Sequence, residues 1–118
     1  IQEYIIKNYY PLDFTLERIR ETYRFSETCQ DTVPQAFEAF FESTGFEDAI
    51  RNAISIGGDS DTLAAITGSV AGAYYGVPAN IRVLTLTFLD GRLLKILLEF
   101  ESRYLQKGEQ NRWIYSDL

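Results

Sequence analysis

Apolar residues recur along most of the chain at the three- and four-residue spacing of amphipathic helices. The clearest stretch predicts a helix from Phe46 to about Ile56, which Gly57-Gly58 should end. Its apolar stripe consists of Ala49, Ile50, Ala53, Ile54 and Ile56. The next helix is expected just after Asp61 and should close at Gly76-Val77-Pro78. Two successive helices joined by a short glycine-rich turn are therefore predicted in the middle of the chain.

Two more helices are predicted upstream of this pair. Asp13 or Thr15 can cap a helix that runs through Leu16, Ile19 and Tyr23. Asp31 or Thr32 can cap the following one, with Pro34 in a first turn that needs no N–H. One face of that helix carries Ala36, Phe37, Phe40 and Phe41, and Gly45 should end it.

The C-terminal third is also read as helical. The segment 90–107 is apolar on most sides, which is typical of a helix buried among others, and Gly108 can stop it. Ile81 to Phe88 fits both a strand alternation and a helical spacing. No second convincing strand is available for pairing, so a helix is preferred. We expect an all-α helical bundle forming a single domain over 1–118, with a polar tail over 108–118 that contains Trp113.

Three glycines follow one another at four-residue intervals: Gly68, Gly72 and Gly76. A glycine inside a helix costs about 1 kcal/mol relative to alanine. The row leaves a groove on the helix, so close approach by the backbone of a neighbouring helix is the expected compensation.

Composition excludes several functional classes. The 118 residues carry a formal charge of −6 and no basic block, which argues against a nucleic-acid partner. No stretch reaches the ~20 apolar residues of a membrane-spanning helix. The absence of His excludes histidine triads and imidazole metal sites within the chain. The single cysteine, Cys29, excludes an internal disulfide, suits a buried structural role and fits a cytoplasmic location.

One segment could carry chemistry: Gly57-Gly58-Asp59-Ser60-Asp61-Thr62. The simpler interpretation is a helix N-cap, in which Asp59 or Asp61 accepts backbone N–H groups. The alternative is a hard-cation site, because Mg²⁺ prefers carboxylate and hydroxyl oxygens and Gly-Gly lets the backbone bend tightly around it. The pattern alone leaves both open.

The surrounding residues favour the second interpretation. Residues 46–76, from Phe-Glu-Asp-Ala-Ile through the acidic motif to Gly-Ala-Tyr-Tyr-Gly, resemble the ADP-ribosylglycohydrolase family closely. The run Thr32 to Phe37 and the run Leu89 to Leu93 also resemble family segments, so the likeness covers about 22–105.

The resemblance implies an all-helical hydrolase with two Mg²⁺ ions, or sometimes Mn²⁺, that cleaves the glycosidic bond between ADP-ribose and a modified group. Asp59, Asp61 and Thr62 match the family's C-terminal metal ligands, and Gly57, Gly58 and Ser60 match the turn that presents them. No catalytic residue separate from these ligands is expected in this chain.

The resemblance also points to what this chain lacks. The family's Thr-Asp-Asp ligands and its early Gly-Asp-x-x-Gly element do not occur in the sequence, which begins at Ile1. We therefore expect a C-terminal fragment or truncated member that supplies half of a two-metal site, binds metal weakly and is inactive alone. A truncated homologue that binds a partner or ADP-ribose without cleavage is the alternative. Either form is expected to self-associate or to associate with the missing N-terminal half, since truncation leaves apolar helix faces uncovered.

Overall fold

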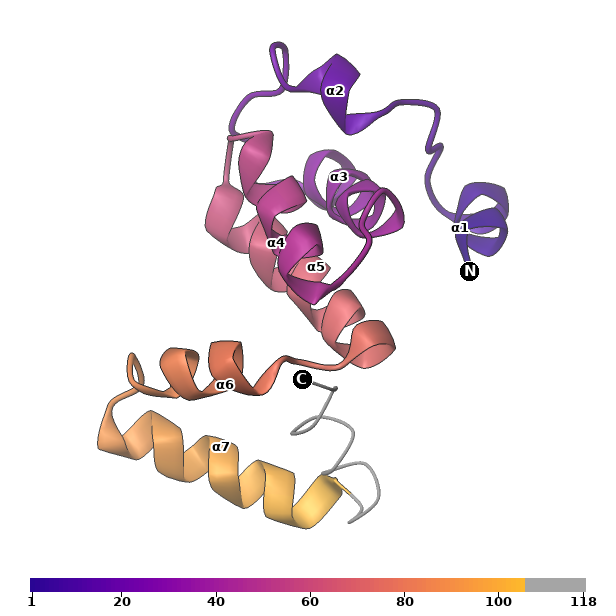
Figure 1. The fold of residues 1–118 in the computed structure, drawn as a ribbon. Helices are drawn as coiled ribbons and strands as arrows, with labels where there is room; N and C mark the ends of the chain where they lie inside the picture. Colours follow the sequence, from indigo (N-terminus) through magenta and orange to yellow (C-terminus); the bar gives the residue numbers. More distant parts are fainter. Residues whose placement is uncertain (106–118) are drawn as a thin grey trace. The chain divides into compact units, whose positions relative to one another are not determined.

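The computed structural model describes residues 1–105, which form seven α-helices and no strand (Figure 1). The helices are α1 (Gln2–Asn8), α2 (Leu16–Ile19), α3 (Cys29–Phe41), α4 (Phe46–Ser55), α5 (Ser60–Tyr75), α6 (Ala79–Leu86) and α7 (Gly91–Tyr104). The all-α prediction is confirmed. The chain divides into two compact units, Ile1–Ala73 and Tyr74–Leu118, and each is described by itself. The predicted tail 108–118, with Gly108 and Trp113, lies outside the described residues.

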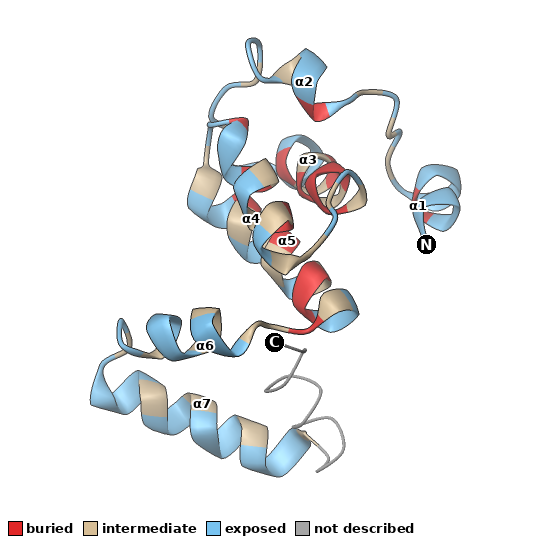
Figure 2. Cartoon of the chain, viewed as in Figure 1, coloured by how far each residue is buried: buried red, intermediate tan, exposed pale blue. Residues whose placement is uncertain are grey.

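The first unit has a core of small and medium side chains contributed by α2 to α5. Its central cluster is Leu16, Ala36, Ala39, Ala53, Ile56 and Leu63. Figure 2 shows this burial concentrated in α3, α4 and α5. Alanines on facing surfaces allow helix axes to approach closely. The amide of Asn52 on α4 also donates to the carbonyl oxygen of Ala39 on α3, at 3.3 Å. The α3–α4 pair therefore forms the framework against which α5 lies.

Besides Leu63 in the central cluster, helix α5 makes one polar contact and one close apolar contact with this framework. The fully buried Thr67 donates its hydroxyl to the carbonyl oxygen of Ala36, at 2.9 Å. A Cβ added at Gly68 would lie 2.9 Å from Cδ1 of Ile50 on α4. The predicted close approach at the glycine row occurs there, but a side chain makes it rather than a helix backbone.

The N-terminal part of this unit differs from prediction in two places. Helix α1 was not predicted from the sequence. Helix α2 begins as expected, with the Thr15 hydroxyl accepting the N–H of Arg18, but it ends at Ile19 instead of continuing through Tyr23. The helix does not reach Tyr23 because that side chain contacts α3 instead: its hydroxyl donates to the carbonyl oxygen of Asp31, at 2.6 Å. The chain leaves the helix where that contact begins.

Helix α3 starts earlier than predicted. Its N-cap is Thr28, so Pro34 lies inside the helix rather than in its first turn. Asp31 is in the first turn, where its Oδ2 accepts the hydroxyls of Ser26 and Thr28 at 3.1 and 3.0 Å. Neither Asp31 nor Thr32 is the cap, because this hydroxyl network organises the chain before the helix. Cys29 is exposed, so its predicted burial was wrong.

The second unit contains α6 and α7. Residues 79–86 are helical, which settles the ambiguous segment in favour of a helix. Asp90 caps α7, with its carboxylate accepting the N–H of Leu93 at 2.8 Å. A half-buried ion pair of 2.7 Å joins Arg82 on α6 to Glu101 on α7. Helix α7 ends at Tyr104, within the predicted range.

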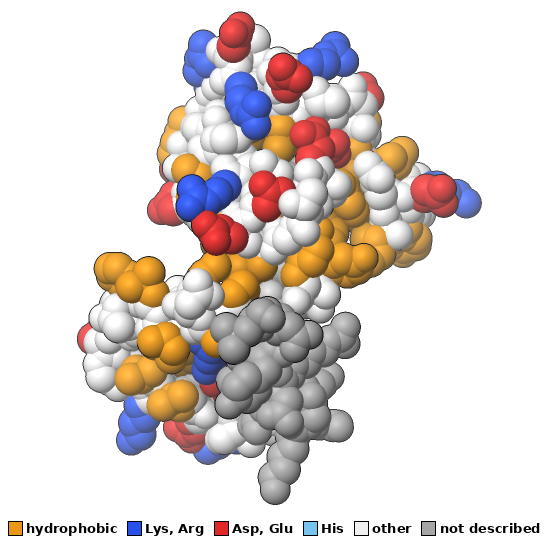
Figure 3. Space-filling model, viewed as in Figure 1, with side chains coloured by type: hydrophobic (Ala, Val, Ile, Leu, Met, Phe, Trp, Pro, Cys, Tyr) orange, Lys and Arg blue, Asp and Glu red, His pale blue; other side chains and the backbone are white. Residues whose placement is uncertain are grey.

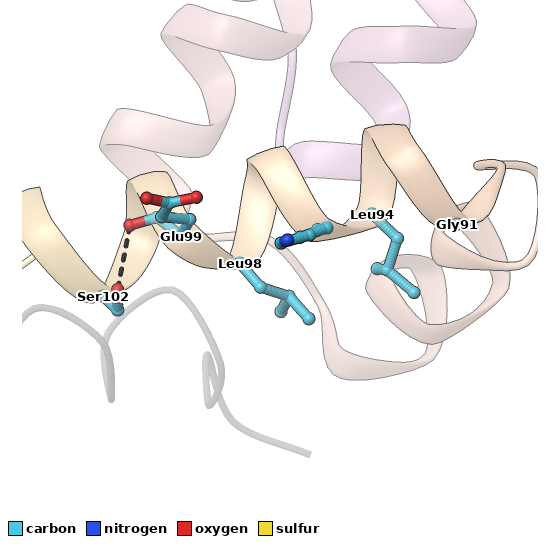
Figure 4. Close-up of a pocket in the computed structure, with 6 residues that line it drawn as sticks. Gly91, Leu94, Leu98, Glu99 and Ser102 are labelled. Carbon is cyan, nitrogen blue, oxygen red and sulfur yellow. Dashed lines mark hydrogen bonds between the residues drawn. The ribbon is translucent and has the colours of Figure 1, made fainter.

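Neither α6 nor α7 contains a buried residue, so the expectation of a helix buried among others is not met in the described chain. Leu94 and Leu98 line a shallow groove of about 740 Å³ along α7 with Gly91, Lys95, Glu99 and Ser102 (Figure 4). A separate exposed apolar stripe on α7 comprises Leu93, Ile96, Phe100 and Tyr104. No helix among residues 1–105 is long and apolar enough to cross a membrane.

Candidate metal-binding turn

The acidic motif occupies the short turn between α4 and α5. Helix α4 ends at Ser55 with the buried Ile56 as its C-cap, and the next two residues reverse the chain with left-handed backbone: φ is +75° at Gly57 and +68° at Gly58. That conformation is costly for residues with a Cβ and free for glycine. The carbonyl oxygen of Asp59 then accepts the N–H of Leu63 at 3.0 Å, so Asp59 is the N-cap of α5. The Gly-Gly pair therefore delivers the motif to the start of a helix.

Gly58 is required for a second reason besides its backbone angle. A Cβ at this position would meet the ring of Tyr23, with 3.0 Å to Cδ1, and the carbonyl oxygen of Arg24 at 3.3 Å. At Gly57 the same Cβ would point into open space. The ring of Tyr23 therefore forms a wall against one side of the turn.

Tyr23 is held in place by the segment around it. Its hydroxyl is anchored on Asp31, and the guanidinium of Arg24 donates to the carbonyl oxygens of Glu21 and Tyr23, each at 2.9 Å. Partial burial raises the pKa of Tyr23 above its usual value, and the negative charges of Asp31 and Asp59 raise it further. The phenol therefore stays neutral beside the acidic turn.

The two aspartates of the motif meet each other. The pKa of Asp61 is lowered, first by a hydrogen bond with the side chain of Asp59 and then by the backbone N–H groups of Thr62 and Asp61. Two neighbouring carboxyl groups favour a proton or a cation between them, because two like charges repel. Asp59 is half-buried, whereas Asp61 and Thr62 are exposed. The backbone N–H groups at the start of α5 thus hold the Asp61 carboxylate, and the Asp59 side chain interacts with it.

This donor set fits a hard divalent cation. Two carboxylates and the adjacent hydroxyl of Thr62 are oxygen ligands of the kind that Mg²⁺ and Mn²⁺ prefer. The ligand set is partial: among residues 1–105, no group of three or more His, Cys, Asp and Glu side chains gathers in a metal-binding arrangement. The motif therefore offers one side of a cation site. Asp59 precedes α5 as its N-cap, Ser60 is the first residue of the helix, and Asp61 and Thr62 follow in its first turn.

The sequence predicts the motif but not the aromatic ring that packs against its turn. Tyr23 lies 35 positions before Gly58 in the sequence, and no local pattern links the two residues. A glycine pair followed by a helix suggests that a neighbouring group lies close to the second glycine, but the sequence does not identify that group.

The family model described as ADP-ribosylglycohydrolase matches residues 2–105. The chain belongs to the ADP-ribosylglycohydrolase family. An all-helical structure with no strand among residues 1–105 agrees with the helical fold of that family.

Individual relatives carry consistent names. The chain is 42% identical over 60 residues to the ADP-ribosylarginine hydrolase Tri1 of Serratia proteamaculans, covering 51% of this chain and 16% of the relative. It is 40% identical over 48 residues to the ADP-ribosylhydrolase ARH3 of Danio rerio, covering 41% of this chain and 11% of the relative. The matched segments are thus small parts of these ADP-ribosylglycohydrolase relatives. No solved structure gives a significant match.

Proposed function

We propose that the chain contributes to Mg²⁺-dependent hydrolysis of the glycosidic bond between ADP-ribose and a modified group. The observation that carries the proposal is the contact between Asp59 and Asp61 at the start of α5, in a chain that belongs to a hydrolase family. The names of the relatives favour ADP-ribosylarginine as the modified group.

In this proposal Asp59, Asp61 and Thr62 hold the cation, with Mn²⁺ as a possible substitute. A bound divalent ion would polarise the scissile linkage, orient substrate hydroxyls and lower the pKa of a bound water. The chain's own part is positional. The backbone N–H groups at the start of α5 hold the Asp61 carboxylate, and the Tyr23 ring fixes the turn that carries Asp59. Both carboxylates are then oriented before the cation arrives.

We further propose that this turn supplies half of the family's two-metal site. Two carboxylates and one hydroxyl leave a divalent ion with mostly water ligands, which gives weak binding. The chain alone should therefore bind Mg²⁺ weakly and hydrolyse substrate at the background rate. A cytoplasmic location belongs to the same proposal and rests on the single cysteine.

The test measures release of ADP-ribose from an ADP-ribosylarginine peptide in excess Mg²⁺. The 118-residue chain is assayed alone and after addition of the remaining segments of a family domain, such as the Serratia relative without its matching region. We expect background turnover alone and activity in the combined sample. Asp59→Ala and Asp61→Ala should each lower that activity by about 10²-fold or more, as loss of a directly acting charged group does.

The matched control is Asp90→Ala, which removes an aspartate from the start of a different helix. This variant should leave turnover unchanged. Full activity of the chain alone, abolished by Asp59→Ala, would contradict the half-site proposal. Full activity of both motif variants in the combined sample would contradict the metal-ligand proposal.

A second candidate function is non-catalytic binding of a protein partner or of ADP-ribose. The exposed apolar side chains of α6 and α7 favour it. Calorimetric titration of ADP-ribose into the chain, with and without Mg²⁺, separates the candidates. Tight binding that survives Asp59→Ala would favour the binding module over the half-site.

The same apolar surface is proposed to associate with the remainder of the family domain or with a second copy. The exposed stripe of α7 includes Phe100 and Tyr104, whose rings lie 4.9 Å apart. Light scattering should detect a dimer or larger species, and a monodisperse monomer of 13.5 kDa would count against self-association. The replacement Phe100→Ser should shift the mass toward the monomer.

A further inference from the structure

Besides the groove on α7, a recess lies in the first unit, between the segment that follows α1 and the first half of α3. Its volume is about 630 Å³, within the usual range for small-molecule and side-chain binding sites. The residues that line it belong to 8–14 and 30–35, so it does not include the acidic turn. Figure 3 shows hydrophobic side chains gathered on this flank of the unit, next to α1.

Aromatic rings form much of the recess. Tyr9, Tyr10 and Phe14 line one side, and the buried Pro34 of α3 lies on the other. Tyr9 is 65% exposed, although an aromatic ring normally gains free energy by burial. Rings displayed in this way offer flat faces on which a planar or cationic group can stack.

Three residues of the recess offer hydrogen-bond acceptors. The side-chain oxygen Oε1 of Gln35 is buried and has no hydrogen-bond partner. The carbonyl of Gln30 lacks its regular helical donor, because the residue four positions later is Pro34, which has no N–H. Asp13 adds a carboxylate at the rim. A buried acceptor without a donor costs about 1–3 kcal/mol, so a ligand rich in N–H groups would be favoured here.

The charge of the recess points the same way. Asp13 is the one ionised residue of its lining, which contains no Lys or Arg, and the whole chain carries −6. Anionic ligands such as phosphates have no cation to bind. A guanidinium group combines a positive charge, five N–H donors, no acceptor and a flat face that stacks on aromatic rings.

We propose that this recess binds the arginine side chain of a polypeptide. The guanidinium stacks on the tyrosine rings and donates to Asp13, Gln35 and the Gln30 carbonyl. The aliphatic part of the side chain lies against Phe14 and Pro34. The proposal is independent of the function of the acidic turn, which shares no residue with the recess.

The test is calorimetric titration of the 118-residue chain with three capped tripeptides that differ at the central residue. The arginine peptide should bind with a dissociation constant of about 1 mM or tighter, as a single side chain in an open recess can achieve. The lysine peptide should bind at least fivefold more weakly, because ammonium neither stacks as a plane nor forms paired hydrogen bonds. The citrulline peptide, which is neutral and nearly isosteric, should not bind measurably.

Two variants locate the binding. Asp13→Asn removes the rim charge, and Tyr10→Leu removes a stacking face; each should weaken arginine binding at least fivefold. The controls are Glu3→Gln and Phe25→Leu, which remove an acidic charge and an aromatic ring at exposed positions outside the recess. Both controls should bind as the unmodified chain does. Circular dichroism confirms that each variant keeps its helices.

Each other outcome overturns the proposal. Equal binding of arginine and citrulline peptides would show an apolar site without charge recognition. Equal binding of the lysine peptide would remove the assignment to guanidinium. The recess is not the site if the arginine peptide fails to bind at a concentration 20-fold above the expected dissociation constant. The same conclusion follows if neither variant weakens binding.

Discussion

Helices α5 and α7 both have an aspartate as N-cap, but the two helix starts are used differently. At α7 the carboxylate of Asp90 accepts the N–H of Leu93, as an ordinary N-cap does. At α5 the carboxyl of Asp59 meets that of Asp61, and it is Asp61 that accepts the backbone N–H groups. The first arrangement stabilises a helix. The second brings two acids together, which stability alone does not require.

The surroundings differ in the same direction. The α5 start is fixed by Gly58 against Tyr23 and by the buried Leu63 directly behind it. The α7 start has no buried residue near it, and Leu93 is 44% exposed. A rigid surround around two neighbouring acids is the arrangement expected of a site that binds something. The comparison therefore separates a functional helix start from a structural one.

The largest expected effect is at the second glycine of the turn. Gly58→Ala must place a Cβ in the left-handed region, which costs about 1–2 kcal/mol, and against Tyr23, which adds about 1–3 kcal/mol of overpacking. Gly57→Ala has the same backbone cost without the collision. Urea denaturation should therefore rank Gly58→Ala as the more destabilised variant. In a Tyr23→Leu background, the difference between the two alanine variants should shrink to the smaller contact with the Arg24 carbonyl oxygen. An undiminished difference would contradict the proposed role of the Tyr23 ring.

A smaller loss is expected from the hydroxyl that attaches α5 to α3. Thr67→Val removes this buried hydrogen bond, although the Ala36 carbonyl keeps its regular donor within α3, so the cost should be about 0.5–1.5 kcal/mol. The control is Thr85→Val in the second unit, where an exposed hydroxyl donates to the carbonyl oxygen of Ile81 at 2.8 Å. That change should stay within about 0.5 kcal/mol. Equal losses in thermal denaturation would mean that the two units do not differ in burial as described.

Substitutions at the two helix caps should differ in their effect on stability. Asp90→Ala should destabilise α7 by about 1 kcal/mol, detected as faster hydrogen exchange of its first amides. Asp59→Asn should stay within about 0.5 kcal/mol, because asparagine keeps a hydrogen bond to Asp61 and removes a like charge. A strong destabilisation by Asp59→Asn would show that Asp59 acts chiefly as a cap.

The smallest effect concerns a buried acid on α3. Burial, and then the neighbouring Glu42, raises the pKa of Glu38, whose Oε2 has no hydrogen-bond partner. A raised folded-state pKa contributes stability that is complete below the usual value of 4.5 and is lost as pH rises through the folded-state pKa. Glu38→Gln should therefore gain up to about 1 kcal/mol relative to the unmodified chain between pH 4 and pH 7. Denaturation at both pH values checks this, with Glu3→Gln as the exposed control. An equal gain at both pH values would contradict the assignment.

Much of the fold was predictable because helical periodicity is a local signal. The α4–turn–α5 segment shows this best: its apolar stripe and its glycines lie next to one another in the sequence. The start of α3 was mispredicted because Thr28 and Asp31 share a hydroxyl network, and the sequence does not reveal which polar residue will be the cap. Helix α1 was missed because its seven residues bury only Ile5.

The candidate site was predictable in its residues but not in its support. Asp59, Asp61 and Thr62 are contiguous and resemble a family motif, so sequence reasoning reached them. The ring of Tyr23 and the hydroxyl of Thr67 act on partners 35 and 31 positions away. Long-range contacts of this kind have no periodic signature. The single-domain prediction stays a prediction, as do the metal and the substrate.

The brevity of the Gly-Gly turn has a kinetic consequence. Only residues 56–59 separate α4 from α5, so the two helices meet after the closure of a very small loop, and closure entropy rises with loop length. Because local contacts of this kind cost little closure entropy, we expect them to form early in folding. The acidic pair is then assembled within the earliest structured piece of the chain. Replacement of Gly58 should consequently slow refolding more than it speeds unfolding.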